Sequence, residues 1–364
     1  MTRPGNRGSI VAFASLCFLE AFACGNAGAQ MQETPAANTW TVTIVLPPKI
    51  VAGELATLAT LGADGKLAPH VTVDFGNGDH IESDTTGRAV FAVPKTGAYL
   101  IARAGASAIA AAIDSPGNVA GASAENPSEN RNAPGISVSP VLPLNDRFWI
   151  CGGGFEGAAE KNRVQINDQF ALVIASSPEC IVVAAAPNTP PGAATILLKT
   201  AAGLKRANTA FVSFDFLPPN PPLITGAKSR LTLRAAGSEK RLRAVVENET
   251  PAVLRFEKGD SQEVTTGGGA QNTAQIRVEA VSSGDFSFHA QLRSTPNVEM
   301  ARQFLELAEP LAPLETQPSL RKLAASLAHH PRKTEKMRIQ LQQILSRTPP
   351  SELHTLLASA YSFL

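Results

Sequence analysis

Short segments in which apolar and polar residues alternate, separated by Gly and Pro, constrain the fold of this chain most. In the segment from Gln275 to Ala280, every second residue is apolar and the residues between are polar or charged. Successive side chains of a strand point to opposite faces, so this pattern predicts a strand with one buried face. The 28 Gly and 27 Pro provide the turns that many short strands require. We therefore expect a mainly β protein built from antiparallel sandwiches.

The length of 364 residues is too great for one ordinary domain and predicts several units. Changes in pattern and composition divide the chain into six segments. These are a signal peptide (1–29), a first sandwich (39–114), a flexible linker (115–134), a second sandwich (135–216), a third sandwich (222–296) and an α-helical C-terminal region (297–364). The linker is assigned because its Gly, Ser, Asn and Pro residues bury too little apolar area to offset the entropy of ordering.

The N-terminus has the three parts of a secretory signal peptide: a basic head, an apolar run and a small-residue cleavage site before Gln30. A lipoprotein signal that uses Cys24 is the alternative, and it would anchor the protein to a membrane. Only Cys151 and Cys180 remain after cleavage before Gln30. In an oxidising compartment such a pair predicts one disulfide; a metal or redox pair is disfavoured because no nearby His or Cys-x-x-Cys accompanies it.

The first two predicted sandwiches each resemble a known family. In the first, Gly53–Leu58, Val71–Val73 and Asp84–Phe91, which contains Thr-Gly-Arg-Ala-x-Phe, are similar to bacterial Ig-like and transthyretin-like repeats of surface proteins. The resemblance spans roughly 75 residues. It implies a structural or adhesive spacer without catalytic residues.

The second sandwich resembles the IPT/TIG immunoglobulin-like fold. Its order is a strand ending at Cys151, a Gly-rich turn with Phe155, two strands, a Pro-rich turn and a further strand. The single Pro140 departs from the longer Pro-Gly opening of that family and leaves the first strand undefined. The resemblance implies that Cys151 and Cys180 lie on neighbouring strands, where a disulfide would contribute roughly 2–4 kcal/mol.

From Asn297 onwards the apolar period changes to that of helices. Four stripes of apolar residues, separated by prolines, predict four short amphipathic helices. Their representative positions are Val298–Ala308, Leu320–Leu327, Met337–Leu345 and Leu353–Tyr361. We expect a small bundle or a cap on the third sandwich. A helix lying on a membrane is disfavoured because the charges on the polar faces are mixed.

No catalytic set is found in the sequence, so no catalytic or cofactor-binding residue and no cofactor is predicted. Asp74, Asp79 and Asp84 could place oxygen ligands for Ca²⁺ at a hairpin, but the twelve-residue loop with a terminal Glu is missing. A solvated turn is the preferred interpretation. The glycines at 152–154 are not followed by a helix, which excludes a phosphate-binding loop and predicts a structural turn.

The expected function is therefore binding. With a formal net charge of +1 and scattered Lys and Arg, the chain lacks the basic stripe of a nucleic-acid binder. We expect an exported, non-catalytic protein that is secreted, periplasmic or at the cell surface and acts in protein–protein interaction or adhesion at the cell envelope. A carbohydrate-binding accessory protein is the alternative, with a glycan as partner. Aromatic residues make up only 5%, which counts against it, and the position of Trp149 leaves open that it is a core residue.

Overall fold

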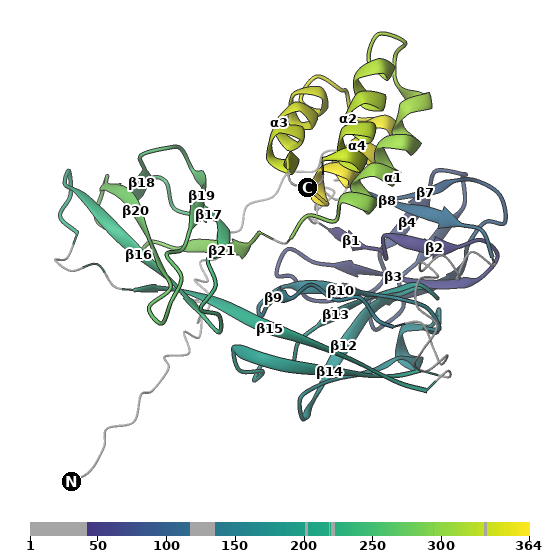
Figure 1. Ribbon diagram of the computed structural model, residues 1–364, viewed down its shortest axis with the longest axis horizontal. Coiled ribbons are helices and arrows are strands. Elements are labelled where there is room, and N and C mark those ends of the chain that lie inside the picture. The colour runs from purple at the N-terminus through teal and green to yellow at the C-terminus, as the bar shows by residue number, and fades with distance from the viewer. Residues whose placement is uncertain are drawn as a thin grey trace, which may run out of the picture. The chain divides into compact units, whose positions relative to one another are not determined.

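The computed structural model describes residues 42–116, 135–200, 203–217, 219, 223–293, 295–330 and 333–364. These residues form a mainly β protein of tandem immunoglobulin-like β-sandwiches followed by a small α-helical region (Figure 1). The predicted signal peptide, the alternative lipid site at Cys24 and linker residues 117–134 lie outside the described residues. Within the described part of the chain, none of the helices has the length and apolar character needed to span a bilayer.

The first sandwich packs two sheets around one apolar core. One sheet contains β2 (Lys49–Val51), β8 (Ser107–Asp114), β7 (Tyr99–Ala104), β4 (Thr72–Phe75) and β5 (His80–Glu82), and the other contains β1 (Thr43–Val45), β3 (Leu55–Leu61) and β6 (Arg88–Ala92). Val73 and Phe75 of β4 are buried while the alternate residues are exposed, as the alternating pattern predicts. Within this first sandwich the pairing is antiparallel, as expected, except that β2 pairs with β8 in parallel.

Strand β3 is buried on both faces because each face is covered by a different core. Leu58 faces the core of the first sandwich, whereas Ala59 and Leu61 pack against Ile174 and Val182 of the second. Because the core shared with the second sandwich covers the other face of β3, residues 56–61 are all buried and do not alternate in exposure.

The second sandwich is made from β9 (Val141–Pro143), β10 (Arg147–Cys151), β11 (Arg163–Ile166), β12 (Gln169–Ser176), β13 (Cys180–Ala184), β14 (Gly192–Thr200) and β15 (Gly203–Leu217), with a 3₁₀ turn at Ala159–Lys161. Its opening segment forms only an isolated bridge from Ser137 to Cys151. The first strand, which the sequence left undefined, is β9, and it lies parallel to β15. Strand β12 contributes to both sheets, since it pairs with β11 at one end and with β13 at the other.

Strand β15 continues from the second sandwich into the third. Its first part pairs with β14, and its last residues, from Ser213 to Leu217, pair with β16. The third sandwich has β16 (Lys228–Ala236), β20 (Thr273–Ala280) and β18 (Leu254–Phe256) in one sheet and β19 (Ser261–Thr265), β17 (Arg243–Asn248) and β21 (Phe288–Leu292) in the other. In β20, Ile276 and Val278 are buried and Gln275 and Arg277 are exposed, as predicted.

The helical region contains α1 (Val298–Ala308), α2 (Gln317–His329), α3 (Thr334–Leu345) and α4 (Glu352–Ser362). Asn297 and Ser351 cap α1 and α4 by accepting a hydrogen bond from a backbone N–H three residues ahead. The predicted bundle is present. The predicted cap on the third sandwich is wrong for the apolar contacts: Ile101, Ala110 and Ala112 of the first sandwich share the core of the helices.

Contacts between the helices and the third sandwich are polar instead. Arg293, which follows β21, pairs with Glu263 of β19 and lies 3.3 Å from Glu335 of α3. Arg338 of α3 also approaches Glu263, at 3.7 Å. Charged pairs of this kind help to orient α3 relative to the third sandwich, but they stabilise the contact less than apolar burial does.

Candidate binding groove

A groove of about 1180 Å³ lies in the helical region. It is bounded by α2, α3, the start of α4 and the segment before α2. The lining positions on α2 and α3 recur every three or four residues, because that spacing returns a helix to the same face. On α2 they are Ser319, Lys322, Leu323 and Ser326, and on α3 they are Lys336, Met337, Gln340, Gln343 and Ile344.

The floor of the groove is apolar. Leu323 and Met337 are buried side chains that also belong to the core of the helical region. Ile344 and Leu353 are partly buried against the same core, and Leu311 is 41% exposed. An apolar floor bounded by helices is the usual form of a site that accepts an amphipathic segment.

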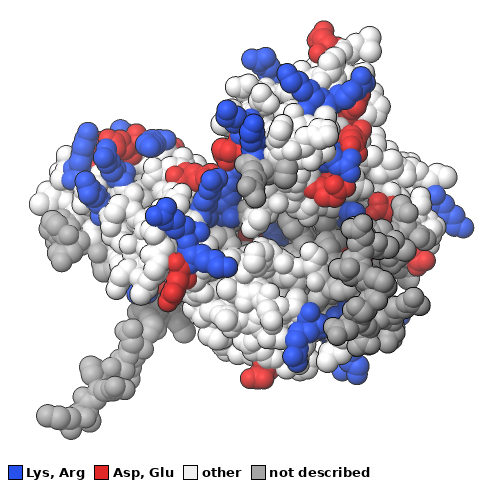
Figure 2. Space-filling model, in the orientation of Figure 1, with Lys and Arg blue, Asp and Glu red and all other residues white. Residues whose placement is uncertain are grey.

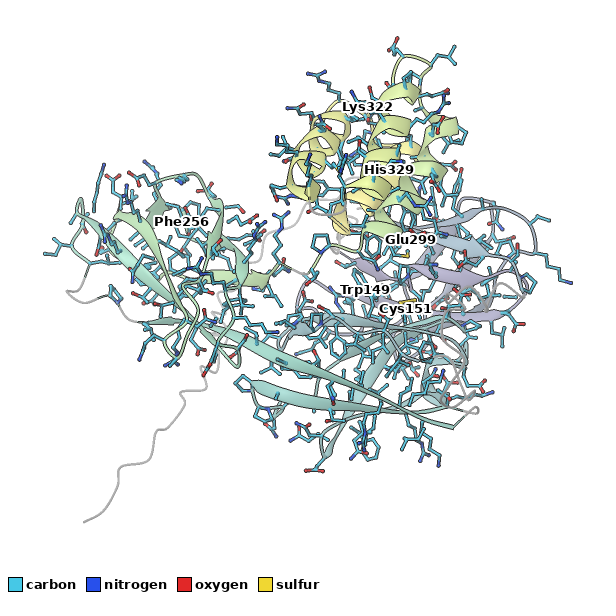
Figure 3. All side chains as sticks on the ribbon, viewed as in Figure 1. Trp149, Cys151, Phe256, Glu299, Lys322 and His329 are labelled. Atoms are coloured by element: carbon cyan, nitrogen blue, oxygen red, sulfur yellow. A yellow bond between two sulfur atoms is a disulfide. The ribbon has the colours of Figure 1, made fainter. Side chains whose placement is uncertain are left out.

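The rim of the groove is rich in basic residues. Lys322, Lys333, Lys336 and Arg347 line it together with His330. In the space-filling view, Lys and Arg side chains are seen over the helical region (Figure 2), and Figure 3 labels Lys322 on α2. Glu315 and Glu352 are the acidic residues of the lining, and Glu352 accepts a hydrogen bond from the Tyr99 hydroxyl at 3.1 Å. The charged lining therefore has an excess of positive charge.

Within the described residues, none of the four Lys and Arg side chains of the groove forms an ion pair. The three arginines elsewhere on the helices behave differently. Arg302 pairs with Glu299 and Glu306, Arg321 pairs with Glu309, and Arg338 approaches Glu263 and Glu335. Among the described residues of this region, the Lys and Arg side chains without an ion pair therefore all line the groove.

The predicted disulfide is present in the structure. Cys151 ends β10 and Cys180 begins β13, and the two are register partners in antiparallel strands with their Cα atoms 4.1 Å apart. The neighbouring-strand position that the resemblance implied is the one found. The bond links two strands of one sheet, so it is a structural element and lies away from the groove.

Two of the three aspartates considered for calcium, Asp79 and Asp84, accept hydrogen bonds from residues close to them in sequence. The Asp79 carboxylate accepts a hydrogen bond from the Asn77 side-chain amide, and the Asp79 backbone N–H donates one to the Asn77 side-chain oxygen. The Asp84 carboxylate accepts a hydrogen bond from the Thr86 hydroxyl at 2.7 Å. That bond is the main cause that lowers the pKa of the Asp84 carboxyl below its ordinary value. Across the described ranges, no group of three or more His, Cys, Asp or Glu has the arrangement of a metal site.

The glycine segment at 152–154 forms a turn between strands, and Gly154 adopts a positive φ of 80°. Lys205, a buried residue that the sequence did not single out, donates a hydrogen bond from Nζ to the Gly153 carbonyl. Its ammonium lies 5.6 Å from the centre of the Phe155 ring. Burial lowers the pKa of Lys205. Lys205 therefore pairs with a backbone carbonyl of the turn, and because it is buried it is not accessible to a ligand.

The sequence left open that Trp149 is a core residue. The side chain is 39% exposed, so it is not part of the core. Its ring lies 5.1 Å from the ring of Phe363, near the end of α4, and Figure 3 labels it. Phe363 in turn stacks on Phe304 of α1 at 5.8 Å. The indole is therefore occupied by an aromatic neighbour from the helical region.

The groove was not predicted from the sequence. The cations that line it come from both helices and from the segments that follow them, and they are interspersed with acidic residues in the sequence. A helical projection of α2 and α3 would have shown Lys322 beside Leu323 and Lys336 beside Met337. That projection does not show that the two faces meet across one groove.

Comparisons with known proteins do not assign a family. No protein-family model matches the sequence, and no curated protein is significantly similar to it. Among solved structures, the full extracellular region of plexin A4 is similar with a TM-score of 0.27 and 9% identity, over 69% of this chain and 32% of that one. The chain thus spans about a third of the plexin.

Two further structures are similar at the same level. SGBP-B of the Bacteroides ovatus mixed-linkage glucan utilization locus, solved with a mixed-linkage heptasaccharide, has a TM-score of 0.24 and 13% identity over 68% of this chain and 73% of that one. The N-terminal four Ig domains of Dscam1 isoform 6.44 have a TM-score of 0.21 and 11% identity over 67% of this chain and 73% of that one. Such low scores carry no conclusion about what this chain binds.

Proposed function

We propose that this chain is an exported, non-catalytic binding protein that acts in protein–protein interaction or adhesion at the cell envelope. The observation that carries the proposal is the groove between α2 and α3, which combines an apolar floor with cations that have no ion-pair partner among the described residues. The helices are held by an apolar core that they share with the first sandwich. In this proposal the sandwiches support and position the helical region, and the groove receives the partner.

The finer assignments of the modules belong to the same proposal. We propose that the first sandwich is a bacterial Ig-like module, that the second is an IPT/TIG-like module and that residues 1–29 are a cleaved signal peptide. The disulfide between Cys151 and Cys180 supports export, because such bonds persist in oxidising compartments. The intact mass of the protein recovered from its native cells distinguishes cleavage before Gln30 from lipidation at Cys24.

Site-specific photo-crosslinking tests the binding function. A photoreactive residue at Gln340, which is exposed in the groove, is expected to capture a protein partner in the native envelope. The matched control is the same residue at Gln275, which is exposed on β20 of the third sandwich. Capture of one protein from Gln340 and not from Gln275 supports the proposal. The proposal fails if no protein is captured from either position or if both positions give the same products.

Among the residues that the structure describes, little favours the carbohydrate-binding alternative. The exposed Trp and Phe side chains in the described part of the chain are Trp149, Phe170 and Phe286. Trp149 contacts Phe363, and the Phe286 ring lies 5.4 Å from that of Phe288, so two of the three rings are already engaged. Sugar recognition by stacking needs free aromatic faces, and Phe170, which is 70% exposed, is the remaining candidate.

A further inference from the structure

We infer that the partner enters the groove as an acidic amphipathic α-helix, an inference that rests on the proposed function and specifies its ligand. The inference depends on three properties of the groove: its dimensions, the spacing of its apolar floor and the distribution of charge along its two walls. Each property is set by residues of α2, α3 and the segments that flank them.

The dimensions fit a short helix. Helix α3 has 12 residues and α2 has 13, so each wall is roughly 18–20 Å long at the usual rise per residue. A bound helix of about three turns would cover that length. The cavity of about 1180 Å³ can receive several large side chains from one face of such a helix.

The apolar floor matches the repeat of a helix. Leu323 of α2 and Met337 of α3 form the buried base of the groove. The more accessible apolar side chains that a ligand would contact are Ile344, Leu311 and Leu353. A ligand helix presents anchors at positions i, i+3, i+4 and i+7 on one face, which is the pattern used when a helix binds in a groove. An extended strand would not find partners here, because the walls are helices whose backbone groups are already hydrogen-bonded.

The charges specify acidic flanks. Lys322 lies on the α2 wall, and Lys336 lies on the α3 wall, so acidic residues on both sides of the ligand's apolar face would meet a cation. His330 and Lys333 lie where α2 ends and α3 begins, whereas Glu315 and Glu352 lie at the opposite end. The ligand should therefore be most acidic toward the end that contacts His330 and Lys333.

The proposal is tested with a synthetic probe and the purified protein beginning at Gln30. The probe is a fluorescein-labelled 14-residue peptide with Leu at positions 3, 6, 7 and 10, Glu at the flanking positions and Ala elsewhere, following the helical repeat. One control peptide has the same composition in scrambled order, and a second has Lys in place of Glu. Fluorescence anisotropy is expected to show saturable binding of the probe and at least about tenfold weaker binding of both controls.

Charge reversal on the two walls supplies the protein side of the test. The double variant Lys322→Glu/Lys336→Glu is expected to weaken binding of the probe by at least about tenfold. The matched control is Lys66→Glu/Lys161→Glu, which reverses two exposed lysines on the sandwiches and should leave the affinity unchanged. Circular dichroism and thermal unfolding of both variants establish that they are folded. Restored binding of the Lys-containing peptide to the groove variant would show that the charges act across the interface.

Three results would overturn the inference. Equal binding of the scrambled acidic peptide would show that the groove selects charge alone. Binding of phosphatidylglycerol vesicles that is lost in the groove variant, without binding of the probe, would assign the site to a lipid surface. Capture of a protein from Gln340 together with failure of the probe to bind would reject the helical ligand and leave the proposed function intact. Conversely, binding of the probe without any captured protein would reject the proposed function and leave the chemistry of the groove.

Discussion

The helical region has two faces that share α2 and differ in how completely their residues are partnered. On one face, Phe304 and Leu305 of α1 and Leu320 and Leu327 of α2 are fully buried with residues of the first sandwich. On the other, the groove is lined by Leu311, which is 41% exposed, and by Ile344 and Leu353, which are only partly buried.

Charges follow the same division. Arg302 and Arg321 lie outside the groove and pair with glutamates, whereas Lys322 and Lys336 lie in the groove and pair with none among the described residues. Arg321 and Lys322 are neighbours in sequence and yet differ in this respect. One face is thus completed by this chain, and the other is the face at which we propose that a ligand binds.

The largest effect is expected from the closed face. The substitution Phe304→Ala removes a fully buried ring that stacks on Phe363, and it should reduce the free energy of unfolding by about 3–5 kcal/mol. Ile339→Ala on α3, at a side chain that is 49% exposed, is the matched control and should change it by less than about 0.5 kcal/mol. Urea unfolding followed by circular dichroism measures both. Similar effects of the two substitutions would mean that the face is not closed as described.

Removal of the disulfide should be next in size and should leave the groove unaffected. The double variant Cys151→Ser/Cys180→Ser releases a loop with a sequence separation of 29, which should lower the free energy of unfolding by about 2–4 kcal/mol through the entropy of the unfolded chain. Binding of the acidic probe peptide should not change, because both cysteines lie on strands of the second sandwich. A loss of probe binding at a temperature where the variant is folded would show coupling that the structure does not contain.

A smaller effect is expected from pH at the margin of the closed face. Asp114, which accepts a hydrogen bond from Gln303 of α1 at 3.2 Å, lies 3.5 Å from Lys49 and contacts Glu179. Burial is the first cause that raises the pKa of Glu179 from 4.5 to about 7, and the hydrogen bond and repulsion from Asp114 add to it. The folded protein therefore binds more protons than the unfolded chain between these values.

The sign of the pH effect follows directly. Stability from Glu179 is greatest at acidic pH, falls as the pH rises from about 4.5 to about 7 and stays low above that range. After allowance for the partial exposure of the carboxyl, the change should be about 1–2 kcal/mol. Glu179→Gln should remove this component, so the difference between the variant and the parent is measured by urea unfolding at several pH values. A difference that does not vary with pH would contradict the assignment.

The smallest effect concerns single cations on the two faces. Arg302→Ala removes two helix ion pairs, with Glu299 and Glu306, and should cost about 0.3–1 kcal/mol at low salt. Lys322→Ala removes a cation without an ion pair among the described residues and should change stability by less than that, or increase it slightly. Thermal unfolding at low and high salt separates the two, since only the Arg302 effect should decrease with salt. Equal effects would remove the distinction between paired and unpaired cations.

Local patterns in the sequence predicted elements well, because each pattern is satisfied within a few residues. The alternation from Gln275 to Ala280 corresponds to β20, and the four apolar stripes correspond to α1–α4. The pairing of Cys151 with Cys180 could be predicted because only two cysteines follow the signal region. Strand β19 was not predicted, because Ser261–Thr265 is exposed at every second position and only half-buried at the others.

Contacts between distant segments could not be predicted in this way. The helices follow the third sandwich in sequence, but their apolar faces are covered by Ile101, Ala110 and Ala112 of the first. Likewise, nothing local indicates that β15 pairs with β14 along one part and with β16 along the other. The groove belongs to the same class, because it exists only where a face of α2 meets a face of α3.

Lysine footprinting of the folded protein tests the open face most directly. The protein is acetylated with and without the acidic probe peptide, and modification of each lysine is read by mass spectrometry. Lys322, Lys333 and Lys336 should be modified readily in the free protein and protected when the peptide is bound, while Lys66 and Lys161 should not change. Uniform protection of all five lysines, or no protection of the three in the groove at saturating peptide, would contradict the claim that this face is completed by a ligand.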